Sequence, residues 1–405
     1  MHTTWTLKNN LNTGLFILAM FCIGVTTFGQ RISLNDSLNG VTAELENRFG
    51  IKKQLNGDLF ILHLGDSHIQ PGGMTIPLSE AVHSVYGNAG YGLAFPYQVA
   101  KTNGQDGYQT KSNVAWEVSK IIHSKKQFPV GVSGYTIHTK DANAKITWEF
   151  DSLSYDNQVQ KIELFHGNVL DSNFQYQIVS EFGEYAKPQR HLSDACHSVF
   201  ILERPTYVFD LLHEQQFAFQ TSSTLYGVKV SNGDPGAIVS AIGVNGATYQ
   251  HYSESLEFRN QLEKLQPDVV VISLGTNEAF QFGDFDDTTF FDQSLNLIQM
   301  ISSLESQPII VLTTPPAVSK VQYKNKKSYF IPNPLVPRVR AVIMDIGLRL
   351  DIPIYDLYSY MGGEDSMKNW AQLGMTDKKR IHFSPKGYRI LGEGMRNAMD
   401  NHLPQ

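Results

Sequence analysis

A serine and a histidine at opposite ends of this chain have the surroundings that nucleophilic catalysis needs. Ser67 follows the apolar run Leu59–Leu64 in the tripeptide Gly65-Asp66-Ser67, which predicts a buried strand that meets a tight turn. His382 lies in a loop before a C-terminal helical pattern, where it could take a proton from Ser67 and return it to a leaving alcohol. By itself, each motif is also typical of a helix N-cap or a surface loop, so the hypothesis depends on their combination.

Two further residues follow strand ends and could contact a bound oxygen. Gly246 comes after the apolar run Ala237–Ile242, and a glycine can present its backbone N–H without obstruction by a side chain. Asn277 comes after Val269–Leu274 and can aim its amide into the same crevice. A turn glycine and a helix N-cap asparagine are the alternative interpretations.

The elements that must position these residues alternate between short apolar strands and helices. Besides the three runs above, strands are expected at Pro308–Leu312 and Ile352–Leu357. Helical patterns lie between them at Glu254–Leu265, Phe290–Leu304 and Val336–Leu350. This alternation predicts an α/β fold with a parallel sheet covered on both faces, in which ligands bind at the carboxyl ends of the strands.

The stretch from residue 101 to residue 231 has a different character. Short, alternating, aromatic-rich segments follow one another, separated by polar turns, and no convincing amphipathic helix occurs. We expect an antiparallel β-sandwich inserted into a loop of the α/β domain. The expected strands include Ile146–Phe150, Lys161–Phe165, Phe174–Val179, Val199–Leu202, Tyr207–Leu211 and Phe217–Gln220.

Together, these motifs resemble the blocks of the SGNH (GDSL) hydrolase superfamily. Gly65-Asp66-Ser67 matches the nucleophile block, Gly246 the second block, Gly275-Thr276-Asn277 the third and His382 the last. The resemblance implies a flavodoxin-like three-layer sandwich in which Ser67 attacks an ester. It also implies an oxyanion hole formed by the Ser67 N–H, the Gly246 N–H and the Asn277 side chain.

A narrower resemblance concerns bacterial peptidoglycan O-acetylesterases that carry an inserted, carbohydrate-binding-module-like β-sandwich. It implies removal of O-acetyl groups from muramic acid or a related sugar, outside the cytoplasm, with an O-acetylated polysaccharide as the partner. No cofactor and no metal are expected. The segments that carry this resemblance are Gly65–His68, Tyr86–Gly92, Gly243–Ala247 and Leu274–Phe280.

The third member of a catalytic triad is not at its usual family position in this chain. The family usually places an aspartate three residues before the histidine, but this chain has Lys379 there. Asp377, five residues before His382, could orient the histidine ring from a longer loop. Alternatively, a backbone carbonyl or water holds the ring and the enzyme works as a Ser-His dyad.

Length and termini suggest the domain organisation. A single hydrophobic core stops growing near roughly 250–300 residues, so we expect this chain of 405 residues to hold more than one domain or a large insertion. Residues 1–29 are interpreted as a cleaved signal peptide, because Lys8 precedes the apolar run Leu15–Val25. The hydrolase domain then comprises residues 30–100 and 232–405, with the insert at 101–231. Export to the periplasm or the exterior follows, with no stable membrane span after cleavage.

Other classes of function are less compatible with the sequence. The net charge is −6 and no basic segment suggested a nucleic-acid partner. His63, Asp66 and His68 would alternate between faces of an extended chain, so they do not predict a metal site. His68 is instead expected to line the pocket beside Ser67. Two alternatives remain: an esterase or lipase for another acyl group, and a non-catalytic glycan-binding protein with a degenerate hydrolase body.

Overall fold

The computed structural model describes residue 48 and residues 58–152, 157–189 and 194–400. The expected signal peptide, residues 1–29, lies outside the described residues. Within them, no helix is long and apolar enough to cross a membrane.

Five parallel strands form the sheet that carries the site. Their spatial order is β13-β1-β14-β15-β18, and each neighbouring pair runs parallel. All their residues are buried, as their continuous apolar runs require of a sheet covered on both faces. The strands are β1 (Leu59–Gly65), β13 (Ala237–Gly243), β14 (Val269–Ser273), β15 (Ile309–Thr313) and β18 (Ile354–Tyr355).

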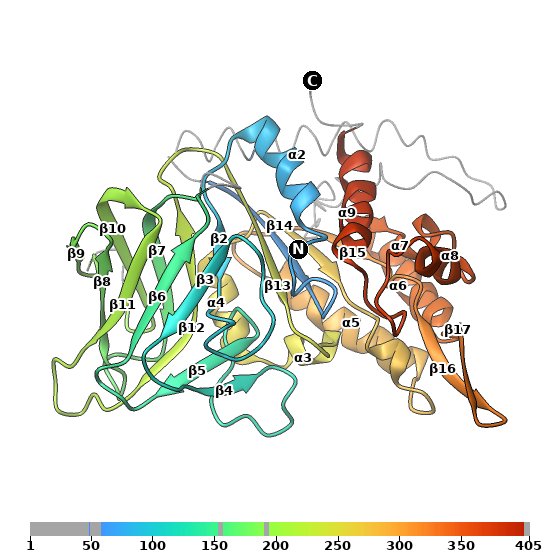
Figure 1. Ribbon diagram of the computed structural model, residues 1–405, viewed down its shortest axis with the longest axis horizontal. Coiled ribbons are helices and arrows are strands. Elements are labelled where there is room, and N and C mark those ends of the chain that lie inside the picture. Colours follow the sequence, from blue (N-terminus) through green and yellow to red (C-terminus); the bar gives the residue numbers. More distant parts are fainter. Residues whose placement is uncertain (1–47, 49–57, 153–156, 190–193, 401–405) are drawn as a thin grey trace, which may run out of the picture.

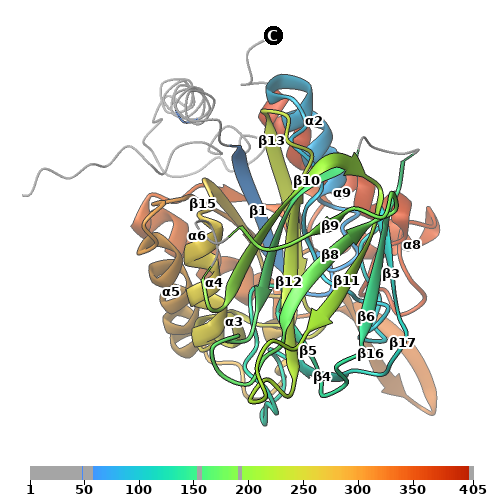
Figure 2. The same ribbon diagram turned by 90° about the vertical axis from the view of Figure 1, so that its left-hand side faces the viewer.

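Helices cover both faces of this sheet and complete a three-layer α/β architecture. Helices α2 and α9 lie side by side on one face, and α3 to α6 lie on the other (Figures 1 and 2). The larger helices are α2 (Ile76–Tyr86), α4 (Leu256–Leu265), α5 (Asp287–Ser302), α6 (Val336–Leu350) and α9 (Pro385–Asp400). Shorter ones are α3 (Tyr249–Ser253), α7 (Leu357–Tyr360), α8 (Ser366–Gln372) and the 3₁₀ turn η2 (Glu278–Phe280).

Two predicted elements of this domain have different bounds in the structure. The helix expected at Glu254–Leu265 is α4, which begins two residues later at Leu256, because Ser255 has the extended backbone of an N-cap residue, with φ −91° and ψ 104°. The strand expected at Ile352–Leu357 has only two residues. Its end is set by Asp356, whose side chain accepts the Ser359 N–H and caps α7.

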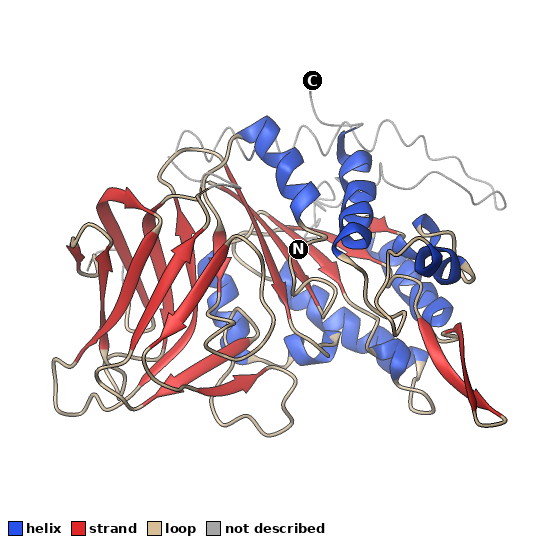
Figure 3. Ribbon diagram, in the orientation of Figure 1, coloured by secondary structure: helices blue, strands red, loops and turns tan. Residues whose placement is uncertain are grey.

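Two antiparallel sheets form the inserted β-sandwich (Figure 3). One has the order β10-β7-β12-β5-β4, with β2 also paired to β12, and the other has the order β3-β6-β11-β8-β9. The first consists of β2 (Gly92–Ala94), β4 (Glu117–Lys120), β5 (Tyr135–Thr139), β7 (Val159–His166), β10 (His197–Thr206) and β12 (Ser223–Ser231). The second consists of β3 (Tyr108–Ser112), β6 (Lys145–Phe150), β8 (Gln175–Ser180), β9 (Tyr185–Ala186) and β11 (Val208–Glu214).

The sandwich differs from the sequence prediction in two places. Strand β2 precedes residue 101 yet belongs to the sandwich, where Val228 pairs with Ala94. The strand expected at Phe217–Gln220 is wrong: this segment is a turn, in which the Gln220 side chain accepts the Gln216 and Phe217 N–H groups. A side-chain hydrogen bond to the backbone offers such a segment an alternative to pairing in a sheet.

A two-stranded hairpin, β16 (Ser319–Lys324) and β17 (Lys327–Pro332), was not predicted at all. It projects from the α/β domain at the end far from the sandwich (Figure 1). Its alternating residues bury little apolar surface, since residues 321–330 are all exposed. The usual core signal was therefore missing from its sequence.

Candidate active site

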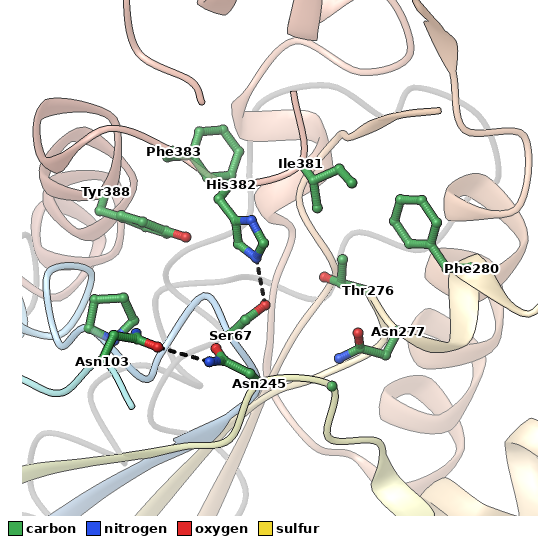
Figure 4. Close-up of a pocket in the computed structure, with 12 residues that line it drawn as sticks. Ser67, Asn103, Asn245, Thr276, Asn277, Phe280, Ile381, His382, Phe383 and Tyr388 are labelled. Carbon is green, nitrogen blue, oxygen red and sulfur yellow. Dashed lines mark hydrogen bonds between the residues drawn. The ribbon is translucent and has the colours of Figure 1, made fainter. Parts of the chain in front are cut away.

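A cavity of about 570 Å³ lies at the carboxyl ends of β1, β13 and β14, and it contains all four motifs. This edge of a parallel sheet is where α/β folds bind ligands. Figure 4 shows Ser67 between the His382 ring and the two asparagines Asn245 and Asn277. The lining residues are Ser67, Pro71, Asn103, Asn245, Gly246, Thr276, Asn277, Phe280, Ile381, His382, Phe383 and Tyr388.

Ser67 and His382, 315 residues apart in sequence, are joined by a hydrogen bond. The His382 Nε2 atom lies 2.8 Å from the Ser67 Oγ atom (Figure 4). This is the distance that a general base needs to remove a proton from a nucleophilic hydroxyl. The structure thus brings together the two residues that the sequence singled out first.

The sharp turn that presents Ser67 depends on a glycine. A Cβ atom at Gly65 would collide with the Ile69 side chain and would stand 2.6 Å from the Ser273 carbonyl oxygen of β14. The end of β1 is further held by Tyr252, whose hydroxyl donates to the Gly65 carbonyl at 2.7 Å. The chain then turns so that the Gln70 N–H reaches the Asp66 carbonyl at 3.0 Å.

The His382 loop is built by its own backbone. The Asp377 N–H donates to the His382 carbonyl at 2.8 Å, and Thr376 forms a β-bridge with Phe383. Arg380, between them, adopts the left-handed region with φ 56°. This narrow loop returns the chain to α9 with the His382 ring directed at Ser67.

Asp377 lies beside the far nitrogen of the histidine ring but outside hydrogen-bond range. Its Oδ2 atom is 3.7 Å from His382 Nδ1, and its Oδ1 atom accepts the Ile381 N–H at 3.1 Å. Both side chains are partly exposed, at 31% for Asp377 and 41% for His382. The Asp377 carboxylate therefore faces the ring across a gap and forms no direct hydrogen bond with it.

Gly246 and Asn277 line the cavity on the side away from the His382 loop. Gly246 has φ 87°, a backbone conformation that residues with a side chain adopt only with strain. Its backbone therefore lines the cavity without a side chain in front of it. The Asn277 amide donates to the Ala247 carbonyl at 2.8 Å, which fixes its orientation. The same nitrogen also donates to the Asp66 carboxyl at 3.4 Å, a long bond that a closer ligand oxygen would replace.

Two buried carboxyl groups, of Asp66 and Glu278, lie close to Gly246 and Asn277. Burial raises the pKa of Asp66 to about 7, against hydrogen bonds from the His68 N–H and Thr276 that lower it. Burial likewise raises the pKa of Glu278 to about 7, with a further contribution from the charge of Asp66. Protonation near neutral pH reduces the negative potential next to Gly246 and Asn277, which favours an oxygen anion there.

His68 and His63 have structural surroundings. His68 was expected to line the cavity, but its buried ring lies behind His382, with ring centroids 5.3 Å apart and Tyr388 Oη 3.1 Å from Nδ1. The His63 ring is hydrogen-bonded to the side chains of Thr75 and Ser273. Burial lowers the pKa of each histidine to about 3, so both are neutral. In the described part of the chain, no group of three His, Cys, Asp or Glu side chains could hold a metal ion.

Sequence reasoning missed two asparagines of the cavity. The Asn245 amide donates to the Asn103 side-chain oxygen at 2.8 Å, and the Asn245 N–H donates to Gln70 at 2.7 Å (Figure 4). Asn245 stands next to Gly246 at a strand end, a position that could have identified it. Asn103 gave no such signal, because it belongs to the segment that we expected to be an insert outside the site.

A protein-family model matches the part of the chain that contains three of the four motifs. The model of the GDSL-like lipase/acylhydrolase family matches residues 217–390, a range that contains Gly246, Asn277 and His382. The nucleophile motif at Ser67 lies on the far side of the sandwich in sequence, but the fold returns it to the same cavity. Residues 217–390 therefore belong to the GDSL-like lipase/acylhydrolase family, which is a family of esterases.

Solved structures extend the likeness beyond the GDSL domain. The chain is similar to a peptidoglycan O-acetylesterase, with 20% identity and a TM-score of 0.72 over 89% of this chain and 95% of that chain. This match covers the sandwich as well as the α/β body, and it shows a shared fold. A lipase/acylhydrolase from Enterococcus faecalis is 23% identical over 42% of this chain and 78% of its own, with a TM-score of 0.29. No curated protein matches the chain in sequence.

Proposed function

We propose that this chain is an exported serine esterase that removes O-acetyl groups from a cell-wall polysaccharide, with peptidoglycan as the substrate. The observation that carries the proposal is the 2.8 Å bond between Ser67 Oγ and His382 Nε2 inside an open cavity. A degenerate, non-catalytic hydrolase body has no need to keep this geometry together with Gly246 and Asn277.

The reaction follows from the positions of these groups. Ser67 Oγ attacks the acetyl carbonyl carbon while His382 Nε2 takes the hydroxyl proton. The oxyanion of the tetrahedral intermediate accepts hydrogen bonds from the Ser67 N–H, the Gly246 N–H and the Asn277 amide. His382 then returns the proton to the sugar oxygen, which leaves as an alcohol. Water, activated by His382, releases acetate from the acetyl-Ser67 intermediate.

In this proposal the negative charge of Asp377 stabilises the protonated form of His382. At 3.7 Å its carboxylate favours the imidazolium that forms at His382 during attack. The Asp377 carboxylate is also anchored to the backbone of the same loop through Ile381, so it moves together with the ring. Lys379, at the usual family position of the acid, contributes no carboxylate to this function.

The cavity supports a sugar as the alcohol half of the ester. Asn103 and Asn245 add amide groups beside Ser67, and Phe280 and Phe383 add aromatic surface. Polar hydrogen-bonding groups next to aromatic carbon suit a ligand that is amphipathic in the way a pyranose is. The shared fold with a peptidoglycan O-acetylesterase, including the sandwich, supports peptidoglycan as the polymer.

Acetate release from three kinds of substrate tests the proposal. We expect the purified chain to act on O-acetylated peptidoglycan faster than on acetylated xylan, and to lose activity on p-nitrophenyl esters as the acyl chain lengthens. A preference for long acyl chains would instead establish an esterase or lipase of another specificity. No hydrolysis of any ester by folded protein would favour the glycan-binding alternative.

A further inference from the structure

One face of the hairpin β16–β17 gathers lysines, from its base at Lys320 to its turn at Lys324 and Lys327. In the antiparallel register, Lys320, Lys324 and Lys327 share a face with Tyr329, because Lys324 pairs with Lys327 and Gln322 with Tyr329. We call these four residues the lysine face. Residues 319–332 contain four lysines and no acidic residue, although the whole chain carries a net charge of −6.

The lysine face is continuous with the rim of the cavity. Lys320 Nζ lies 4.5 Å from the ring centroid of Phe282, whose ring contacts Phe280 at 5.7 Å, and Phe280 lines the cavity. On the other face of the hairpin, the Arg380 guanidinium lies 4.5 Å from the Phe330 ring centroid, and Ile381 beside it lines the cavity. The base of the hairpin therefore stands between two segments that form the cavity wall.

The hairpin keeps these charges at a cost to its own stability. Lys324 and Lys327 are directly opposite each other, an arrangement in which like charges repel. The turn residues Asn325 and Lys326 both have positive φ, 51° and 63°, which is a type I′ turn that favours glycine at its second position. Lys326 occupies that position, so the sequence accepts strain and adds another cation. Within the described residues, none of these lysines forms a salt bridge.

We propose that the lysine face binds a carboxylate-bearing polysaccharide strand whose acetylated sugar occupies the cavity. The lysines complement the carboxylates, and Tyr329, 49% exposed, offers a ring on which a sugar can stack. This inference rests on the proposed function and adds the chemical class of the polymer. It also assigns recognition of the strand to the hydrolase body, through a surface whose base lies at the cavity wall.

Binding to strands without acetyl groups tests the lysine face separately from catalysis. The probe is soluble, de-O-acetylated peptidoglycan, compared with the same material after its carboxylates are converted to amides. For the double variant Lys324→Gln/Lys327→Gln we expect Kd to rise about 2- to 30-fold, since each of the two exposed ion pairs that are lost contributes roughly 0.2–1 kcal/mol. Tyr329→Ala should also weaken binding, and higher salt should reduce the difference between wild type and the lysine variant.

A charge-matched control removes two exposed lysines from the sandwich. Lys111→Gln/Lys187→Gln makes the same change in net charge far from the hairpin and should leave Kd unchanged, although these lysines pair with Glu149 and Glu214. In turnover assays, the lysine variant should raise KM for O-acetylated peptidoglycan and leave the rate on p-nitrophenyl acetate unaltered. Glutamine at an exposed strand position keeps the hairpin length, so loss of folding does not obscure the result.

Three outcomes would overturn the inference. One is equal binding of carboxylated and amidated strands by wild type, and another is an unchanged Kd for the lysine variant. The third is tighter binding of single-stranded DNA than of the glycan, which would identify a different partner. If wild type binds the carboxylated strand through these lysines but releases no acetate from any polymer, the proposed function fails and the binding surface stands.

Discussion

Replacement of Asp377 by asparagine tests how much the charge of this carboxylate contributes to catalysis by His382. The substitution keeps the shape of the side chain and its bond to the Ile381 N–H, and it removes only the negative charge 3.7 Å from His382 Nδ1. Coulomb's law gives about 1.1 kcal/mol at that separation in water and about 4.5 kcal/mol at an effective dielectric constant of 20. Because both side chains are about a third exposed, we expect a value near the lower figure.

That energy corresponds to a modest loss of rate. A barrier increase of about 1–2 kcal/mol lowers kcat roughly 5- to 30-fold, far less than the ~10⁴-fold loss seen when a buried, hydrogen-bonded triad aspartate is neutralised. The assay is steady-state hydrolysis of p-nitrophenyl acetate by wild type, Asp377→Asn, His382→Ala and the double variant. Asp234→Asn, at an exposed turn, is the control for loss of one carboxylate.

Two results would refute this reasoning. A loss comparable to that of His382→Ala, with no further loss in the double variant, would mean that Asp377 closes onto the ring in the working enzyme. No loss at all would mean that the charge is fully screened and that Ser67 and His382 work as a dyad. In that case Lys379→Asp, which restores the usual family spacing, should accelerate the enzyme.

Two further substitutions test the side of the cavity that is proposed to hold the oxyanion. Asn277→Ala should lower kcat about 10²- to 10³-fold with little change in KM, since its amide bonds mainly to the developing oxyanion; a change confined to KM would assign Asn277 to substrate binding. Burial raises the pKa of Asp66 from 3.8 to about 7, so between these pH values folded wild type keeps a proton that the unfolded chain has released. Wild type therefore loses stability as pH rises from about 4 to 7, and Asp66→Asn should gain stability relative to it over the same range. Urea unfolding at several pH values measures this, and a difference that does not vary with pH would contradict the buried, protonated carboxyl.

The sequence was sufficient for the elements with strong periodicity. The apolar runs around Leu59, Ala237 and Val269 became the three strands that carry Ser67, Gly246 and Asn277, and α6 has the predicted bounds Val336–Leu350. Each run had to be buried on both faces, which leaves a parallel sheet as the solution. The motifs at the strand ends then converged because parallel strands end at one edge of the sheet.

Features that depend on tertiary contacts could not be predicted. Asn103 enters the cavity through its bond to Asn245, a pairing 142 residues apart in sequence. Strand β2 joins the sandwich because Ala94 pairs with Val228, across the boundary that composition suggested at residue 101. His68 follows Ser67 in sequence, but its ring lies in the interior, where it is hydrogen-bonded to Tyr388. Lys320 and Lys327 share one face only once the hairpin has formed.

The most direct test of the central claim is to find the acetyl group on Ser67 during turnover. Wild type is mixed with O-acetylated peptidoglycan, quenched in acid and analysed by peptide mass spectrometry, with Ser67→Ala treated in parallel. We predict an acetylated peptide that contains Ser67 in wild type, and neither that peptide nor acetate release in the folded Ser67→Ala variant. Acetate release that continues in Ser67→Ala, or turnover by wild type with acetyl on another residue, would contradict the account.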